Sequence, residues 1–411
     1  MKDSLTNIKK ILEGIHFGNK VSIFFLLLMA YYILNLFTSD INSGMSGGME
    51  AEHNIVNQVM ASLVTVFAIY HSISTPAKPS YTLVNVTAFF LIYLTIRYYF
   101  GFINSYHNNI TFFSGLVHMV FWGGGLIFSM NCFRFATPKD IQKLIRMMIL
   151  VYLVFALYRL FTQKEIITRI GISAGVNAVS GAFMIAPLVL MAFRGKMRIV
   201  LFIVCGFICV YSAKRQSAAG MAIITFFNLK LIYKSYFHKR KILAAFSLIV
   251  VLFFGSSYIY KVFDDLNRRQ EIRSEKEDVD SGRALLWKAA LDGFERSDNS
   301  TKWVGGGPGA GRKYIGEYYP IARAPHNGFI QVLCDYGYIG LFLYSLFFLV
   351  LLGYVVKVKG MDNKLLYLSI CFAWIFKNVI SHPGGLTLIF LSIGVGYIFY
   401  RQNKEGNTEL V

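Results

Sequence analysis

Three ionisable side chains stand where polar sequence meets apolar sequence, and their types suit a group transfer from a diphosphate. Arg215 lies in YSAKRQSAAG, a short break between two apolar runs, Arg283 lies in SGRALLW, and His326 lies in APHNGF. Arginine keeps its charge and can bind diphosphate oxygens in a bidentate manner. Histidine can accept a proton from an attacking hydroxyl, because its ordinary pKa is close to neutral pH. These residue types therefore suggest a diphosphate clamp with a base nearby.

Each of the three residues also has a simpler interpretation. Arg215 fits a side chain that reaches from an apolar helix to the membrane surface. Arg283 fits an ion pair with one of the neighbouring acids, and His326 fits the start of a helix at the interface. The chain has 8 histidines, so a single histidine is weak evidence. Taken alone, the spacing leaves both interpretations open.

A glycine-rich segment, GGGPGAGRKY, lies between Arg283 and His326. It lacks the Gly-Lys-Ser/Thr ending of a nucleotide-binding loop, so a series of turns is expected instead. Arg312 and Lys313 at its end can meet an anionic lipid head group. Arg97, Arg159 and Lys377 are further cationic candidates within apolar sequence, where charge is costly and often functional.

The composition indicates a protein that crosses a membrane many times. Of 411 residues, 55% are hydrophobic and only 15% are charged, too few charges for a soluble protein of this size. About twelve apolar stretches have the length of a membrane-spanning helix, ~20 residues. They lie roughly at residues 21–37, 54–71, 82–104, 111–130, 143–163, 177–193, 199–213, 216–233, 242–259, 337–356, 365–380 and 384–400.

The basic residues predict the orientation of these helices. Loops on the side of the termini include FRFATPKDIQKLIR and YKSYFHKRK, whereas the short opposite loops carry Lys164, Arg169, Lys214 and Arg215. Because basic loops stay in the cytoplasm, both termini are predicted to be cytoplasmic. The net charge of +19 is then a topology signal, and no nucleic-acid partner is expected.

The predicted division of the chain follows from this topology. Residues 1–20 form a cytoplasmic tail, 21–259 form nine transmembrane helices, 260–327 form a catalytic loop in the periplasm, 328–400 form three more helices, and 401–411 form a second cytoplasmic tail.

Within the long loop, SGRALLWKAALDGF has apolar residues at helical spacing. They are Ala284, Leu285, Trp287, Ala290, Leu291 and Phe294. Ser281 can cap such a helix. The 5 cysteines form no CxxC pair and are expected to be small core residues, with no metal or disulfide role.

Four segments, taken in order, resemble the O-antigen ligase/polymerase superfamily of bacterial envelope glycosyltransferases. They are KRQSAAG (214–220), SGRALLW (281–287), WVGGGPGAG (303–311) and PHNGFIQVLCDYGYIGL (325–341). The last is the most specific, with its Pro-His-Asn followed by an acid, a glycine and Ile-Gly. The rest of the chain is similar only in hydropathy.

The resemblance implies an all-α fold of the membrane glycosyltransferase C type, with a large periplasmic loop and a site on the periplasmic face of the inner membrane. It implies an undecaprenyl-diphosphate-linked glycan donor, a glycan-lipid or lipid A–core acceptor, and no metal or other cofactor. Arg215 and Arg283 look like the pair that holds the pyrophosphate, and His326 looks like the general base. Arg312, Lys313 and Asn327 complete the expected substrate-binding set. Membrane lipids and a chain-length regulator protein are the other expected partners.

Two functions in this superfamily fit the residues. A polymerase transfers the growing chain onto the next repeat unit, whereas a ligase transfers the finished chain onto lipid A–core. Lys214 stands where ligases more often have serine or threonine, which favours a polymerase, but the short loop after the fifth predicted helix favours a ligase. A glycan-lipid transporter is a remote alternative, since no inverted repeat or buried acid cluster is evident.

Overall fold

The computed structural model describes residues 19–38, 55–74, 81–103, 109–169, 181–212, 215–236, 283–319, 324–380 and 388–405. Within these ranges every regular element is a helix and no strand occurs, as the all-α prediction requires. The predicted helix at 242–259 and the charged segment 260–282 lie outside the described residues, and so does Ser281.

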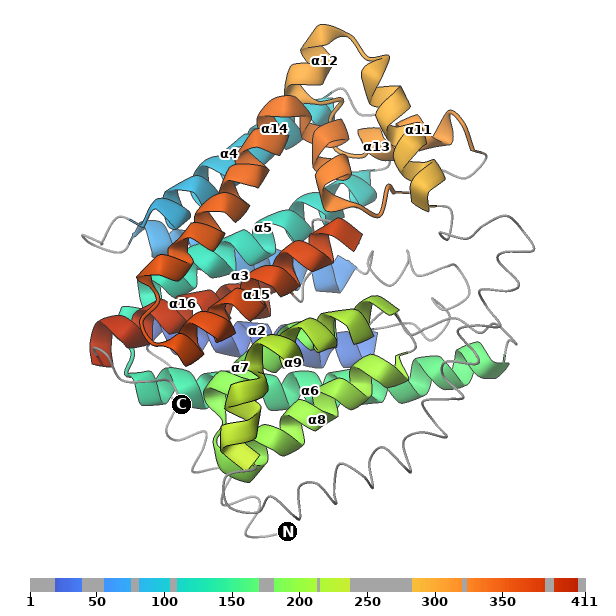
Figure 1. Cartoon of the computed structure of the whole chain (residues 1–411). Coiled ribbons are helices and arrows are strands. Elements are labelled where there is room, and N and C mark those ends of the chain that lie inside the picture. The colour runs from blue at the N-terminus through green and yellow to red at the C-terminus, as the bar shows by residue number, and fades with distance from the viewer. Residues whose placement is uncertain are drawn as a thin grey trace.

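A bundle of long helices makes up most of the protein (Figure 1). Its α-helices are α2 (Lys20–Thr38), α3 (Ile55–Ile73), α4 (Thr82–Ile103), α5 (Asn109–Cys132), α6 (Pro138–Arg169), α7 (Ala186–Ala192), α8 (Gly195–Tyr211), α9 (Arg215–Tyr236), α14 (Gly328–Gly353), α15 (Met361–Ile380) and α16 (Leu388–Glu405). Short 3-10 turns η3 (Phe133–Phe135), η4 (Ala182–Ile185) and η5 (Tyr354–Lys357) join some of them.

A small helical unit, which we call the cap, comprises residues 283–319. It contains α11 (Arg283–Glu295), α12 (Asn299–Val304) and α13 (Ala310–Gly316) and stands at one end of α14 and α4 (Figure 1). The predicted helix in SGRALLWKAALDGF is confirmed as α11, but its predicted apolar face is only partly right. Leu285 is 54% exposed, whereas Leu286 is buried, because contacts with α13 and α14 decide which face turns inward.

The largest difference from the sequence prediction concerns α14, where one unbroken apolar span was expected at roughly 337–356 within the helical region predicted from residue 328. It begins at Gly328 and is broken at Gly337, whose φ of 67° and ψ of −166° are not helical. The ring of Phe329 lies 5.3 Å from that of Tyr344 and 5.6 Å from that of Phe348. A straight helix would separate these residues by more than about 20 Å along its axis. The first half, residues 328–336, therefore folds back against the second half, residues 338–353.

Three helical stretches among the described residues are long and apolar enough to cross a bilayer by length and composition: Thr82–Phe100, Pro138–Thr162 and Gly328–Lys357. The third contains the reversal at Gly337. Shorter apolar stretches are Lys20–Leu34, Val59–Ile73, Ala182–Ala192 and Gln216–Ile232. These helices support a membrane protein, while the count of about twelve spans remains a prediction.

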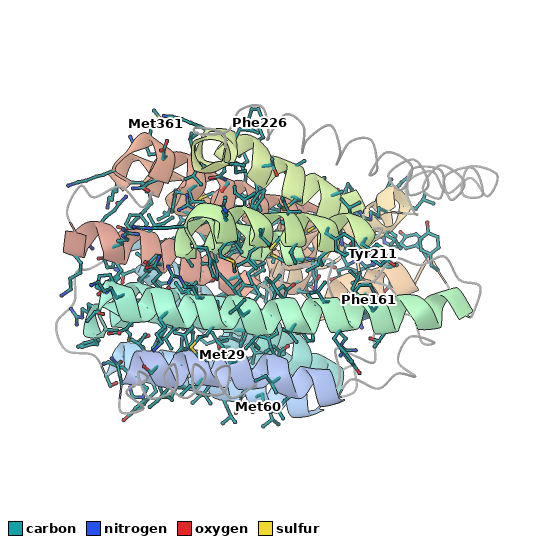
Figure 2. All side chains as sticks on the ribbon, turned by 90° about the horizontal axis from the view of Figure 1, so that it is seen from below. Met29, Met60, Phe161, Tyr211, Phe226 and Met361 are labelled. Atoms are coloured by element: carbon teal, nitrogen blue, oxygen red, sulfur yellow. The ribbon has the colours of Figure 1, made fainter. Side chains whose placement is uncertain are left out.

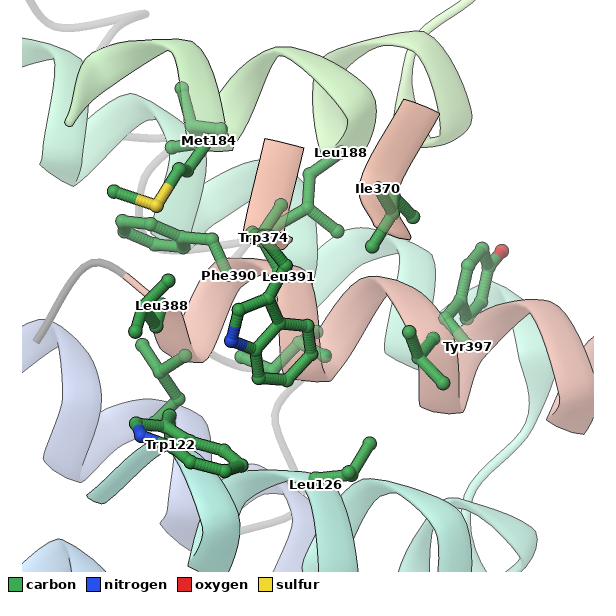
Figure 3. Packing of buried hydrophobic residues seen from close by; sticks show 14 of the residues in the cluster. Trp122, Leu126, Met184, Leu188, Ile370, Trp374, Leu388, Phe390, Leu391 and Tyr397 are labelled. Atoms are coloured by element: carbon green, nitrogen blue, oxygen red, sulfur yellow. The ribbon is translucent and has the colours of Figure 1, made fainter. Parts of the chain in front are cut away.

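Aromatic and aliphatic side chains together fill the centre of the bundle (Figure 3). Trp122 of α5 and Trp374 of α15 are fully buried and pack edge to face, 5.2 Å between ring centroids. Phe347 of α14 contacts both rings, at 5.1 and 5.4 Å. This cluster joins α5 to α14 and α15, two helices that lie much later in the sequence.

Small residues let neighbouring bundle helices approach closely, as is common in membranes. A Cβ on Gly125 of α5 would lie 2.8 Å from Cγ1 of Ile389, and one on Gly396 of α16 would overlap Ser129. The hydroxyl of Ser392 donates to the carbonyl of Trp122 at 2.8 Å, which joins the same two helices.

Apolar side chains also cover the outside of the bundle, as lipid contact would require. Figure 2 shows Phe161 of α6 beside Tyr211 of α8, with ring centroids 5.9 Å apart. Phe226 and Met361 project at the edge of the same view and are exposed. The five cysteines are all buried, as expected for small core residues.

Candidate functional site

Three of the four sequence motifs meet at Pro325. The indole nitrogen of Trp287, in α11, donates to the carbonyl of Pro325 at 2.8 Å. A Cβ on Gly311, in α13, would lie 3.2 Å from Cγ of the same proline. Arg283 lies one helical turn before Trp287, Arg312 follows Gly311, and His326 follows Pro325. The tertiary structure therefore brings the segments of Arg283, Arg312 and His326 together.

His326 has an unusual backbone conformation. Its φ is 54°, and it is the one non-glycine residue with a positive φ in the described part of the chain. Such a conformation costs about 1–3 kcal/mol for a residue with a Cβ, and it concentrates at functional sites. The observation separates His326 from an ordinary helix-start residue.

The helix start belongs to the next residue, Asn327. Its side-chain oxygen accepts from the backbone N–H groups of Phe329 and Ile330, at 3.0 and 3.2 Å, and so caps α14. Since the oxygen is used in this way, the amide nitrogen of Asn327 is the part of the side chain that can donate to a substrate.

The glycine-rich segment forms a tight loop that meets the break in α14. Gly305 and Gly337 both have positive φ, and a Cβ on either would overlap backbone atoms of the opposing segment. The N–H groups of Gly306 and Gly307 donate to the carbonyls of Cys334 and Asp335, at 3.0 and 3.1 Å. The loop therefore satisfies carbonyls at the end of the first half of α14, which the reversal would otherwise leave without partners.

Asp335 holds the other end of the same loop. Its carboxylate is buried and accepts from the N–H of Gly311 at 3.1 Å. The N–H of Gly309 and the side chain of Gln331 donate to it as well, and Arg312 lies close enough to interact with its charge. The sequence analysis assigned no role to this acid. Its place in CDYG was visible, but the donors come from a segment some twenty-five residues earlier in the chain.

Two side chains of α4 attach the loop to the bundle. Arg97 donates to the carbonyl of Gly305 at 2.7 Å, and the hydroxyl of Tyr93 donates to the carbonyl of Tyr336 at 2.8 Å. Arg97 was one of the cationic candidates in apolar sequence. Because it bonds to Gly305, Arg97 has a structural role: it holds the glycine-rich loop against α4.

The cap has its own apolar core, in which α11 crosses α13 closely. Leu286, Ala290, Phe294, Ile315 and Cys334 are among its members. A Cβ on Gly293 would overlap Tyr314, whose hydroxyl shares a hydrogen bond of 2.9 Å with Ser297. Burial raises the pKa of Tyr314, which therefore stays neutral at physiological pH. The candidate site is thus supported by the packed apolar core of the cap.

A carboxylate stabilises the N-terminus of α12 within the cap. Asp298 caps this helix by accepting from the backbone N–H of Thr301 at 2.9 Å and from the hydroxyl of Ser300 at 2.7 Å. These hydrogen bonds hold the pKa of Asp298 well below its ordinary value, with the Thr301 N–H as the main cause. Arg296 pairs with Glu317 at 3.4 Å on the surface.

The predicted site residues fall into two groups. Arg283, Arg312, Lys313, His326 and Asn327 all lie in the cap or in the segment that follows it; Arg312 is half-buried and Lys313 is exposed. Arg215 is the first residue of α9, and its side chain lies outside the described residues. Its convergence with Arg283 and His326 remains a prediction.

Among the described residues, no three His, Cys, Asp or Glu side chains are grouped as metal ligands would be. The groups present near Pro325 are cations, an imidazole and backbone N–H donors, a set that suits an anionic substrate. Metal independence itself remains a prediction.

Comparison with known proteins gives one family match. Residues 200–345 match a family model described as O-antigen ligase. This stretch contains all four sequence motifs, from α8 to the second half of α14. No curated protein matches the chain.

Proposed function

The match of residues 200–345 to the O-antigen ligase family model supports the O-antigen ligase/polymerase superfamily, and on that premise we propose that this chain is a membrane glycosyltransferase that polymerises a surface polysaccharide. In the proposed reaction, the enzyme joins repeat units carried on undecaprenyl diphosphate at the periplasmic face of the bacterial inner membrane. Both termini face the cytoplasm in this proposal, and the cap faces the periplasm.

Arg215 and Arg283 hold the pyrophosphate of the donor in the proposed mechanism. Undecaprenyl diphosphate is already a good leaving group, so catalysis mainly needs alignment and stabilisation of the charge that develops on the departing oxygen. Two fixed guanidinium groups supply this stabilisation without a metal.

His326 acts as the general base. The acceptor hydroxyl attacks the anomeric carbon of the donor sugar, its proton passes to the imidazole, and the bond between that carbon and the pyrophosphate oxygen breaks. A direct displacement of this kind inverts the anomeric centre. Arg312, Lys313 and the amide of Asn327 bind the remaining phosphate and sugar oxygens.

The observation that carries the proposal is the meeting of three motif segments at Pro325. The hydrogen bond from Trp287 and the contact of Gly311 join the chain segments that carry Arg283, Arg312 and His326, which supports a shared site. The strained backbone of His326 supports a functional role for that residue.

A ligase is the second candidate, and the short connection after the fifth predicted helix favours it. The arginines and the histidine suit both reactions, because the donor chemistry is the same. In a ligase the acceptor is lipid A–core, whereas in a polymerase it is another lipid-linked repeat unit.

The lipopolysaccharide gel profile of a deletion strain tests the choice. Loss of a polymerase leaves core that carries a single repeat unit. A bare core, with long chains retained on the carrier lipid, would overturn the polymerase in favour of the ligase. Release of undecaprenyl diphosphate by the purified protein, stimulated by acceptor, separates either enzyme from a transporter.

A further inference from the structure

Two aromatic side chains stand exposed where the cap meets the break in α14. Trp303 of α12 is 60% exposed and Tyr338, directly after Gly337, is 45% exposed. Their rings pack edge to face with centroids 5.7 Å apart, and Tyr338 also packs edge to face against Phe294 at 5.5 Å. The pair is thus held in place by the cap while much of its surface remains uncovered.

Hydrogen bonds to α4 indicate the depth of the Trp303–Tyr338 pair relative to the membrane. Arg97 bonds the carbonyl of Gly305, two residues after Trp303, and Tyr93 bonds that of Tyr336, two residues before Tyr338. The apolar stretch of α4 that could cross a bilayer runs from Thr82 to Phe100. The aromatic pair therefore lies level with the last turns of a candidate membrane span, where hydrocarbon gives way to lipid head groups.

The surface beside the pair is continuous with the outer surface of the bundle. Phe342 lies one helical turn beyond Tyr338 in α14 and is 65% exposed. On α4, Ile92 and Ile96 are exposed at the same level. Since α4 packs against α14, these exposed apolar side chains and the aromatic pair belong to neighbouring helices, and such a surface is suited to lipid contact.

We propose that Trp303 and Tyr338 anchor the cap in the head-group region of the outer leaflet. Both residues combine an apolar ring with one polar group, which suits them to this boundary. The occupant of the surface is phospholipid, because its depth and its continuity with the exposed apolar side chains of α4 and α14 match a lipid boundary. The anchor would fix the height of Pro325 and His326 above the hydrocarbon, where a lipid-borne diphosphate lies. The choice of the outer leaflet and this last consequence rest on the proposed function, whereas contact of the pair with lipid head groups does not.

Fluorescence quenching in lipid vesicles tests the anchor without using activity. Full-length protein and Trp303→Phe are reconstituted into phosphatidylcholine vesicles that carry a spin label either near the carbonyl end or near the methyl end of the acyl chain. The difference between the two proteins isolates the emission of Trp303. The other three tryptophans, Trp122, Trp287 and Trp374, are present in both proteins and cancel in the subtraction.

We expect the shallow label to quench Trp303 about twofold more than the deep label, and aqueous iodide to quench it weakly. Strong quenching by iodide with none from either lipid label would overturn the proposal, since the ring would then lie in water. Resistance to all three quenchers would also overturn it, because a second copy or a protein partner would then cover the surface. Since no glycan is present, failure of the anchor is distinguishable from failure of the transferase.

Discussion

The bundle core and the cap are held together in different ways. Around Trp122 and Trp374 the bundle packs side chain against side chain, with aromatic rings and small residues filling the volume. Around Pro325 and Gly337 the cap is joined by backbone hydrogen bonds and by glycines that touch backbone atoms. Side-chain packing can adjust when a neighbour is trimmed, but backbone contacts cannot. The candidate site is therefore built where the backbone geometry tolerates the least change.

The largest effects are expected from substitutions of the three proposed catalytic residues. We expect Arg283→Ala, His326→Ala and Arg215→Ala each to lower transferase activity about 100-fold or more, because in the proposed mechanism each removes a group that acts on the transition state. Membrane insertion should be unchanged, as judged by protein level and thermal unfolding. The measurement is transfer from an undecaprenyl-diphosphate-linked donor by purified protein.

Lys288→Ala is the matched control for these variants, since Lys288 is an exposed cation on the same helix as Arg283. It should retain its activity. Normal surface glycan in any of the three site variants would remove that residue from the mechanism.

Gly337→Ala and Gly305→Ala should each destabilise the protein by about 3 kcal/mol or more, since a Cβ at positive φ is strained and would overlap the opposing backbone. Gly353→Ala is the control: its φ of −59° is helical and no atom lies within 4 Å of a Cβ placed there. That variant should be neutral or slightly more stable. Thermal unfolding in detergent measures all three variants. If all three melted at the same temperature as the wild type, the close backbone contact between Gly305 and Gly337 would be contradicted.

Asp335→Leu should cost about 1–3 kcal/mol, because the buried N–H of Gly311 loses its acceptor. Asp335→Asn keeps one acceptor oxygen and should cost less. Slower hydrogen exchange at Gly311 in the wild type than in Asp335→Leu would locate the effect. If the leucine variant were as stable as the wild type, the carboxylate would have no role in holding the loop.

In the bundle, Gly125→Ala should cost about 1–2 kcal/mol, because its Cβ would press on the side chain of Ile389. Adding Ile389→Ala removes the opposing atoms, so the double variant should be more stable than the sum of the two single changes predicts. Thermal unfolding of the wild type, the two single variants and the double variant in one detergent gives the coupling free energy between the two positions. Simple additivity would mean that the Cβ added at residue 125 does not press on Ile389.

The smallest effect concerns pH and the cap of α12. Because hydrogen bonds lower the pKa of Asp298 in the folded protein, its contribution to stability is complete above the ordinary Asp value of 3.8 and is lost as the pH falls below it. Asp298→Ala should therefore lower the melting temperature slightly at neutral pH, with the difference shrinking in strong acid. Asp298→Asn, which can still cap the helix, should differ less from the wild type. A difference that is the same at every pH would contradict this account.

The sequence by itself determined the class of protein and most of the helices. Runs of apolar residues have to be covered by lipid or by each other, so α2 to α9, α15 and α16 appear close to where hydropathy predicts them. The helical period in SGRALLWKAALDGF likewise predicted α11. The motif residues predicted a resemblance to the O-antigen ligase/polymerase superfamily, which the family match over residues 200–345 supports.

Only the tertiary structure decided the reversal of α14, the strained backbone of His326 and the role of Asp335. A hydropathy pattern reports how apolar a segment is, and Gly328–Gly353 is apolar on both sides of Gly337. Whether the chain continues or folds back there depends on the loop at Gly305 to Gly307, whose N–H groups satisfy the freed carbonyls. These donors and acceptors are far apart in sequence, and no local pattern pairs them.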